Sequence, residues 1–309
     1  MLNERIAKNV GPAHLDIAWE ERGDPSHPTV LLVMGVAAQL VNWPLGFLEA
    51  LVARGLHVVR FDNRDSGRST HMRDAPPPDL PAAMKGDVSS ASYTLSDMAA
   101  DAVGLLDALS IDSAHVVGAS MGGGIAQTMA IEHPARVRSL TTMMWTTGDP
   151  SVGQMHPATA RAVFGGPPPR TREEFIANAV SRHQVVGSPQ YPIDPVAVAE
   201  VAALAYERDH DPVAPARQGL ATLASGDRTE RLRSLEVPTL VLHGLSDTVC
   251  DPSGGRATAA AIPGAELVLI DGMGHNLPPG LWDRIADPIR AIVQKGEARW
   301  RTTTSSKHA

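Results

Sequence analysis

Short runs of β-branched and aliphatic residues alternate with helix-like segments along most of this chain, and this alternation constrains its fold most strongly. The runs occupy residues 29–34, 57–61, 115–117, 139–145, 238–243 and 266–270. A continuous apolar run of this length is typical of a strand buried on both faces of a sheet. Because parallel strands need long crossover connections, usually helices, the alternation predicts an α/β fold with a mostly parallel central sheet flanked by helices.

The segments between these runs carry apolar residues at helical spacing. They predict helices over 47–54, 96–110 and 124–132, and a final helix over 281–295. Ser96 or Asp97 is placed to cap the start of the second of these helices.

Residues 150–234 differ from the rest of the chain. They hold proline-rich breaks and helix-like pieces at 173–185 and 195–208, with no run typical of a buried parallel strand. We therefore expect an α/β core over 1–149 and 235–298, a helical lid over 150–234, and a disordered tail over 299–309.

Charge and composition exclude several classes of protein. A formal net charge of -7 argues against a nucleic-acid or anionic-membrane surface. The single cysteine, Cys250, excludes an intrachain disulfide framework and a cysteine-rich zinc site. The N-terminus has no apolar signal-peptide region, and no apolar run reaches the roughly 18–20 residues that span a bilayer. We expect a cytoplasmic monomer or homodimer that acts on a small molecule.

Residues 118–122 (GASMG) match the pattern G-x-S-x-G, between a predicted strand and a predicted helix. A nucleophilic serine needs this strained strand-to-helix turn so that its oxygen projects clear of the backbone. The start of the following helix directs N–H groups to the place where an anion forms during acyl transfer. Ser120 is therefore the candidate nucleophile, and a glycine-rich turn with a buried serine is the structural alternative.

Phosphate and dinucleotide binding can be tested on the same residues. A P-loop needs lysine followed by serine or threonine after its last glycine, but Gly123 is followed by Gly124 and Ile125. A dinucleotide fingerprint needs glycine two residues after Gly118, where this chain has Ser120. Neither pattern fits, so we expect no cofactor.

A serine hydroxyl needs a base, and the base needs a carboxylate that holds its tautomer. His275 follows the last apolar run in a glycine-containing loop, and Asp247 follows the run over 238–243. Asp251 and Asp271 are rivals for the carboxylate, although Asp251 precedes Pro252 and could cap a helix. The predicted triad is Ser120, Asp247 and His275.

A metal site is the other interpretation of these acidic and imidazole groups. His243, Asp247, Asp251 and His275 are all ligand types, but the chain lacks H-E-x-x-H and C-x-x-C, and its histidines are scattered. We expect no catalytic metal.

These features together resemble the α/β-hydrolase superfamily, and within it most of all the aclacinomycin methylesterase-like esterases. The similar stretches are LLVMG (31–35), Trp43-Pro44, LHVVRFDNRDSGRST (56–70), HVVGASMGG (115–123), VPTLVLHGLSD (237–247) and IPGAELVLIDGMGHNLP (262–278). They cover most of the core on both sides of the insertion, which itself matches poorly.

The resemblance implies roles for individual residues. Ser120, His275 and Asp247 would be nucleophile, base and acid, and the backbone N–H groups of Met121 and Val36 would form an oxyanion hole. Many relatives have His-Gly where this chain has Met34-Gly35. Because the oxyanion donor is a backbone group, this difference removes a polar side chain but not the donor. Residues 64–69 match a loop, R-D-x-G-x-S, that is structural in the family.

The chain is thus expected to be a serine hydrolase that cleaves a carboxylic ester through an acyl-enzyme, with an apolar or polyketide-like methyl ester as candidate substrate. A carbon–carbon bond hydrolase, a cofactor-free perhydrolase and an inactive receptor of the same fold are the alternatives. The expected pocket residues, for which core packing is the competing explanation, are Met34, Trp43, Met121, Met144 and Trp145.

Overall fold

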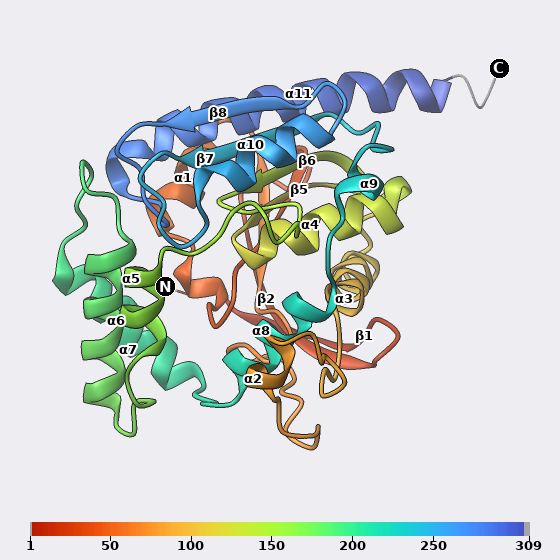
Figure 1. Cartoon of the computed structure of the whole chain (residues 1–309). Coiled ribbons are helices and arrows are strands. Elements are labelled where there is room, and N and C mark those ends of the chain that lie inside the picture. Colours follow the sequence, from red (N-terminus) through yellow and green to blue (C-terminus); the bar gives the residue numbers. More distant parts are fainter. Residues whose placement is uncertain (1, 306–309) are drawn as a thin grey trace.

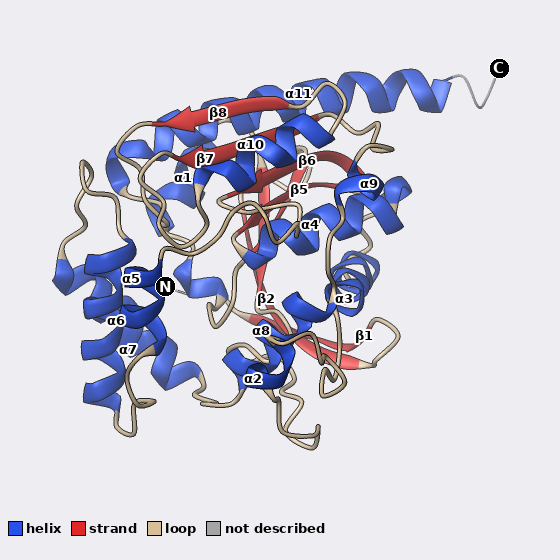
Figure 2. Ribbon diagram, viewed as in Figure 1, coloured by secondary structure: helices blue, strands red, loops and turns tan. Residues whose placement is uncertain are grey.

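An eight-stranded sheet forms the centre of the computed structural model, which describes residues 2–305 (Figure 1, Figure 2). Its strands are β1 (Arg5–Val10), β2 (Leu15–Arg22), β3 (Thr29–Val33), β4 (His57–Phe61), β5 (Ala114–Ala119), β6 (Val137–Met143), β7 (Thr239–Gly244) and β8 (Glu266–Ile270). They lie in the order β1-β2-β4-β3-β5-β6-β7-β8, and β4 to β8 pair in parallel along that order. The predicted α/β fold class is confirmed.

The antiparallel strands β1 and β2 were not predicted from the sequence. β1 is mostly exposed, and β2 ends in charged residues, so neither has a continuous apolar run. Glu20 of β2 is nevertheless buried, because its carboxylate accepts hydrogen bonds from Arg60 of β4. The ion pair between neighbouring strands compensates for the burial of both charges.

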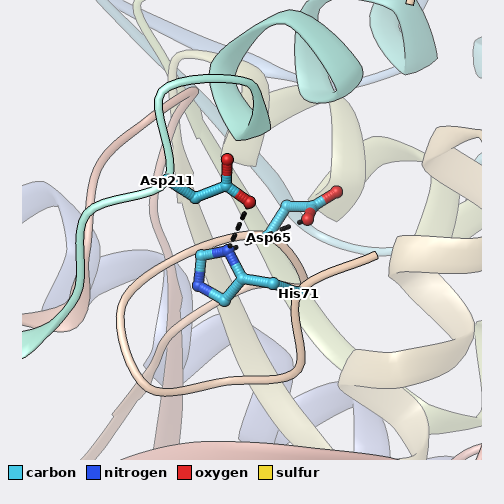
Figure 3. A group of neighbouring side chains, drawn as sticks. All are labelled: Asp65, His71 and Asp211. Carbon is cyan, nitrogen blue, oxygen red and sulfur yellow. Dashed lines mark hydrogen bonds and ion pairs between the residues drawn. The ribbon is translucent and has the colours of Figure 1, made fainter. Parts of the chain in front are cut away.

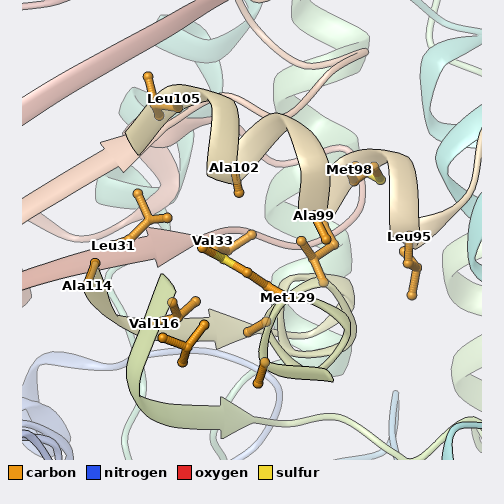
Figure 4. Packing of buried hydrophobic residues seen from close by; sticks show 14 of the residues in the cluster. Leu31, Val33, Leu95, Met98, Ala99, Ala102, Leu105, Ala114, Val116 and Met129 are labelled. Carbon is orange, nitrogen blue, oxygen red and sulfur yellow. The ribbon is translucent and has the colours of Figure 1, made fainter. Parts of the chain in front are cut away.

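Helices cover both faces of the sheet (Figure 2). Those packed on the core are α1 (Leu45–Ala53), α3 (Leu95–Ala108), α4 (Met121–Glu132), α10 (Pro252–Ala261) and α11 (Trp282–Ser305). Alternate residues of β3 point to opposite faces: Leu31 and Val33 pack towards α3 and α4, whereas Val30 and Leu32 pack towards α1 and α11. Figure 4 shows the first of these two clusters, in which side chains of α3 meet those of β3 and β5.

The starts of two helices differ from the prediction. The cap of α3 is Thr94, because its hydroxyl accepts from the Asp97 N–H while the Asp97 carboxylate accepts from the Thr94 N–H at 2.8 Å. Asp97 thus completes a capping box from inside the helix, and Ser96 has no part in it. α4 begins at Met121, directly after Ser120, and not at Gly124.

The predicted lid region, residues 150–234, contains only helices and connecting loops. Its helices are α5 (Pro157–Phe164), α6 (Arg172–Val186), α7 (Pro195–Arg208), α8 (Ala214–Ala224) and α9 (Thr229–Leu232). α5, α6 and α7 pack together beside the sheet, and α8 packs against the short helix α2 (Leu80–Ala83) of the core (Figure 1). We call residues 150–234 the lid below.

Buried ion pairs join the lid to the loop after β4. Arg208, at the end of α7, pairs with Asp62 at 2.7 Å, and Arg217 of α8 pairs with Asp65 at 2.7 Å. In the same loop, Arg64 pairs with Asp101 of α3 at 2.6 Å. Through Arg64 and Asp65, the loop over 64–69 therefore connects α3 and the lid to the sheet.

Asp65 also belongs to a group with His71 and Asp211, whose polar atoms lie within 4.8 Å of one another (Figure 3). Three such side chains could in principle bind a metal ion. However, one guanidinium nitrogen of Arg217 lies 2.7 Å from each of the two carboxylates. Arg217 thus lies between the two carboxylates, and Arg73 Nε lies 3.8 Å from Asp211, as in an ion-pair cluster.

The prediction of a disordered tail from residue 299 is wrong for residues 299–305, which continue α11. Arg299 pairs with Glu236 at 2.9 Å, and the Arg138 guanidinium lies 5.1 Å from the centre of the Trp300 ring. These side-chain contacts stabilise a segment that is polar in sequence. Residues 306–309 lie outside the described residues. Among the helices of residues 2–305, none combines the length and the apolar character needed to cross a bilayer.

We expect Arg208→Ala to lower the free energy of unfolding by about 3–5 kcal/mol, because it leaves the buried Asp62 carboxylate without its cation. Urea unfolding at neutral pH measures the change. Arg172→Ala is the matched control, since it removes an exposed lid pair with Glu207 and should change the same quantity by less than about 1 kcal/mol. Equal losses in the two variants would contradict this account of the buried pair.

Candidate active site

Ser120 lies at the tight turn between β5 and α4. Its backbone has φ 54° and ψ -132°, an unfavourable conformation for a residue with a side chain. The glycines on either side make the turn sterically feasible. A Cβ atom on Gly118 would lie 2.0 Å from the Gly122 carbonyl oxygen, and one on Gly122 would lie 2.0 Å from the Val33 carbonyl oxygen. Both glycines of G-x-S-x-G are thus required by the packing of β3, β5 and α4.

The structure brings Ser120, His275 and Asp247 together from three separate loops. Ser120 follows β5, Asp247 follows β7 and His275 follows β8, so all three lie at the carboxyl edge of the sheet. His275 Nε2 is 3.0 Å from Ser120 Oγ, and His275 Nδ1 is 2.7 Å from Asp247 Oδ2. The imidazole therefore bridges hydroxyl and carboxylate, which is the geometry that general-base activation of a serine requires.

The Asp247 carboxylate is fully buried, and both of its oxygens accept hydrogen bonds. Its Oδ1 accepts from the N–H groups of Val249 at 2.9 Å and Cys250 at 3.0 Å. Burial raises the pKa of this carboxyl, but the neighbouring His275 charge and hydrogen bonds from His243, His275 and the Cys250 backbone outweigh burial and hold the pKa well below its usual range. Asp247 therefore stays ionised at neutral pH and can stabilise an imidazolium.

The two rival aspartates have other partners. Asp251 Oδ1 accepts from the Ser253 N–H at 2.9 Å and caps α10, as its position before Pro252 suggested. Asp271 lies on the exposed side of its loop, 3.4 Å from the amide nitrogen of Gln190. Of the three, Asp247 is the carboxylate within hydrogen-bond distance of His275.

The sequence offered His243 as a possible metal ligand and did not predict its contact with Asp247. Its ring is fully buried at the end of β7, with Nε2 2.8 Å from the Cys250 carbonyl oxygen and 3.5 Å from Asp247 Oδ2. His243 thus packs against the turn that presents Asp247. The available signal was a histidine at the end of a buried strand, four residues before the acid.

The two predicted oxyanion donors lie on backbone next to Ser120. Met121 is the first residue of α4, so its N–H has no acceptor within the helix. Gly35, which precedes Val36, is so close that a Cβ atom there would lie 2.8 Å from the Ser120 Cβ. On the other side of Val36, Ala37 donates its N–H to Gln218 Oε1 of the lid at 2.8 Å. The role of these N–H groups as an oxyanion hole remains a prediction.

The predicted pocket residues lie at different depths. Trp43 is fully buried and stacks on Phe47 with ring centres 5.9 Å apart, so core packing accounts for it. Met34 and Met144 are buried members of the same cluster, whereas Trp145 is half-buried on the other face of the sheet, against α4. Contact of any of these side chains with a substrate remains a prediction.

Two exposed apolar side chains were not predicted as pocket residues. Val36 follows β3 and is 38% exposed, and Leu245 follows β7 and is 42% exposed. Both lie on loops of the edge that holds Ser120 and His275. Their sequence signal is weak, since a single apolar residue in a loop is common on protein surfaces.

The chain is similar in sequence to known proteins. Residues 28–279 match the family described as having the alpha/beta hydrolase fold. Rhodomycin D methylesterase DnrP of Streptomyces peucetius is 30% identical over 292 residues, which is 88% of this chain and 93% of that protein. The 2-hydroxymuconate semialdehyde hydrolase of Pseudomonas putida is 29% identical over 218 residues, 67% of this chain and 71% of that protein.

Solved structures are similar in fold. The meta-cleavage product hydrolase CumD of Pseudomonas fluorescens IP01, solved as a mutant complexed with acetates, superposes with a TM-score of 0.70. The match covers 93% of this chain and 98% of that one at 21% sequence identity. At this identity the likeness concerns the arrangement of strands and helices.

The lowered pKa of the Asp247 carboxyl predicts a pH dependence of stability. Because the pKa is lower in the folded chain, ionised Asp247 stabilises the fold at neutral pH, and this contribution is lost as the pH falls below the pKa of the unfolded chain. We expect the free energy of unfolding to fall more steeply from about pH 5 to pH 3 in the wild type than in Asp247→Asn. Urea titrations at each pH measure the slopes. Asp271→Asn, at an exposed position, should keep the wild-type slope, and parallel curves for wild type and Asp247→Asn would refute the prediction.

Proposed function

Because this chain belongs to the α/β-hydrolase fold family and is a hydrolase acting on esters, we propose that it cleaves a carboxylic ester through an acyl-enzyme on Ser120. One observation carries the proposal. The Asp247 carboxylate, the His275 imidazole and the Ser120 hydroxyl form a continuous hydrogen-bonded series, with separations of 2.7 and 3.0 Å. A serine at a tight strand-to-helix turn, with an imidazole nitrogen at its oxygen, is equipped for nucleophilic acyl transfer.

In the proposed first step, Ser120 Oγ attacks the ester carbonyl carbon while His275 Nε2 takes the hydroxyl proton. The negative charge that develops on the carbonyl oxygen accepts hydrogen bonds from the N–H groups of Met121 and Val36. His275, now positively charged beside Asp247, gives its proton to the departing oxygen. The carbon–oxygen bond breaks, an alcohol leaves, and the acyl group stays on Ser120.

In the second step, His275 removes a proton from water as the water oxygen attacks the acyl carbon. The same N–H groups stabilise the second oxyanion, and collapse of this intermediate returns the proton to Ser120 and releases a carboxylic acid. Each preorganised oxyanion donor is worth about 3–4 kcal/mol of transition-state stabilisation in enzymes of this type. The strained turn at Ser120 contributes by keeping the first of these donors, at the start of α4, beside the reacting oxygen.

The proposed substrate is an apolar ester, such as the methyl ester of a bulky polyketide-like molecule. Exposed Val36 and Leu245 offer apolar surface on loops at the edge that holds Ser120, and no fixed cation is needed to bind a neutral ester. Met34 also places an apolar side chain where many relatives carry histidine. The activity for which the Streptomyces relative is named, methylesterase, supports a methyl ester in particular.

A carbon–carbon bond hydrolase is the second candidate. It is favoured by the similarity to the Pseudomonas putida 2-hydroxymuconate semialdehyde hydrolase. The same three side chains would serve that reaction, with a carbon atom as the leaving group in place of an alcohol oxygen. A perhydrolase of this fold would differ only in the molecule that reaches Ser120. An inactive receptor would differ only in its lack of turnover.

We expect the wild type to hydrolyse at least one p-nitrophenyl ester in a panel of chain lengths, and Ser120→Ala to lose kcat by roughly 10⁴-fold or more, because the variant has no nucleophile. A fluorophosphonate probe should label the wild type stoichiometrically and leave Ser120→Ala unlabelled. Ser181→Ala, an exposed position on α6, should behave like the wild type.

The results separate the candidates. Labelling of Ser120 without hydrolysis of any ester would overturn the esterase in favour of the carbon–carbon bond hydrolase or the perhydrolase. An unlabelled wild type that also cleaves no ester would favour the receptor.

A further inference from the structure

The loop that presents His275 is bonded to the lid as well as to the core. His275 donates its backbone N–H to the carbonyl oxygen of Val186, at the end of α6, at 2.7 Å. Its neighbour Gly274 donates its N–H to the hydroxyl of Ser188 at 2.9 Å. Two successive N–H groups of the loop thus have acceptors in the lid, one at the end of α6 and one in the connection to α7.

The two glycines before His275 allow this close approach. A Cβ atom on Gly274 would lie 2.3 Å from the Gly187 carbonyl oxygen, closer than any side chain can pack. Gly272 has φ +68° and lies against the side chain of Gln190, which a Cβ atom there would meet at 2.3 Å. The spacing of the glycines in residues 271–275 (DGMGH) therefore reflects contact with the lid.

Ser188 occupies the centre of this contact. The residue is buried, at 4% exposure, and its hydroxyl both accepts and donates a hydrogen bond. Its oxygen accepts from the Gly274 N–H, and its hydrogen is donated to the side-chain oxygen of Asn276 at 2.5 Å. One hydroxyl of the lid thus holds the residues immediately before and after His275.

We propose that Ser188 is a positioning residue, which holds the Gly274 backbone on one side of His275 and the Asn276 side chain on the other, so that the imidazole stays between Ser120 and Asp247. The proposal rests on the function proposed above. The two side-chain hydrogen bonds of His275 orient the ring, but they do not fix the backbone from which the ring extends. A displacement of about 1 Å of a catalytic group can cost about 100-fold in rate, so the backbone contact has a large effect on turnover.

This arrangement couples the lid to the chemistry. A movement that lifts residues 186–188 from the core breaks the bonds to Gly274, His275 and Asn276 together and releases the base from its position. We therefore expect the part of the lid that follows α6 to remain in place during turnover.

The test compares Ser188→Ala with Ser188→Thr, which keeps the hydroxyl, and with Ser181→Ala, an exposed lid serine seven residues away. Steady-state hydrolysis of the best p-nitrophenyl ester gives kcat and KM, and the rate of Ser120 labelling by a fluorophosphonate gives a readout that needs no ester. Thermal unfolding followed by circular dichroism establishes that each variant is folded at the assay temperature.

We expect Ser188→Ala to lower kcat about 10- to 100-fold with KM within about two-fold of the wild type, because substrate contacts are kept while the base is misplaced. The labelling rate should fall by a similar factor. Ser188→Thr should recover most of both rates, and Ser181→Ala should match the wild type.

A folded Ser188→Ala with kcat and labelling rate within two-fold of the wild type would overturn the proposal. A rise in KM that accounts for the whole loss, or equal loss in Ser188→Thr and Ser188→Ala, would overturn it too. If the wild type is labelled but cleaves no ester, the esterase proposal fails, whereas the labelling rates still decide the role of Ser188.

Discussion

The close approach of three backbone segments around Ser120 is the constraint on which the site depends. Gly35, Gly118 and Gly122 each face atoms that leave no room for a Cβ, so the end of β3, the end of β5 and the start of α4 pack directly on one another. This packing holds Ser120 at φ 54°, a conformation that the local sequence would not adopt alone. The nucleophile and the start of α4 are consequently fixed by β3 and β5, in the centre of the sheet.

The lid makes buried polar contacts with the core at several places. Gln218 accepts a hydrogen bond from Ala37, next to the predicted oxyanion donor, and Arg208 and Arg217 pair with aspartates of the loop after β4. The connection after α6 holds the residues around His275. Because these contacts are buried and polar, separating the lid from the core would leave several groups without partners at once. Lid and core are therefore expected to unfold together.

The sequence predicted the parts of the molecule that follow from short-range patterns. Six apolar runs correspond to β3 to β8, and G-x-S-x-G placed Ser120 at the turn where the structure has it. β2 was missed because its buried Glu20 is compensated by Arg60, 40 residues away. Ser188 was missed for the same reason, since its partner Gly274 lies 86 residues away and a lone polar residue in a loop has no local signature. Long-range polar pairs become visible only when the fold is known.

The place of the lid in the chain has a consequence for how such proteins diversify. β6 and β7 are adjacent and parallel. Whatever its sequence, the chain must therefore return from the carboxyl end of β6 to the opposite side of the sheet, where β7 begins. The lid lengthens this obligatory return, and each doubling of the length of a flexible connection costs only about 0.6 kcal/mol in chain entropy. Insertions and exchanges of whole helices here leave every strand ladder intact. New specificities can therefore arise by recombination within this one connection, provided that the imported segment again supplies acceptors for the two amides before Asn276 and cations for Asp62 and Asp65.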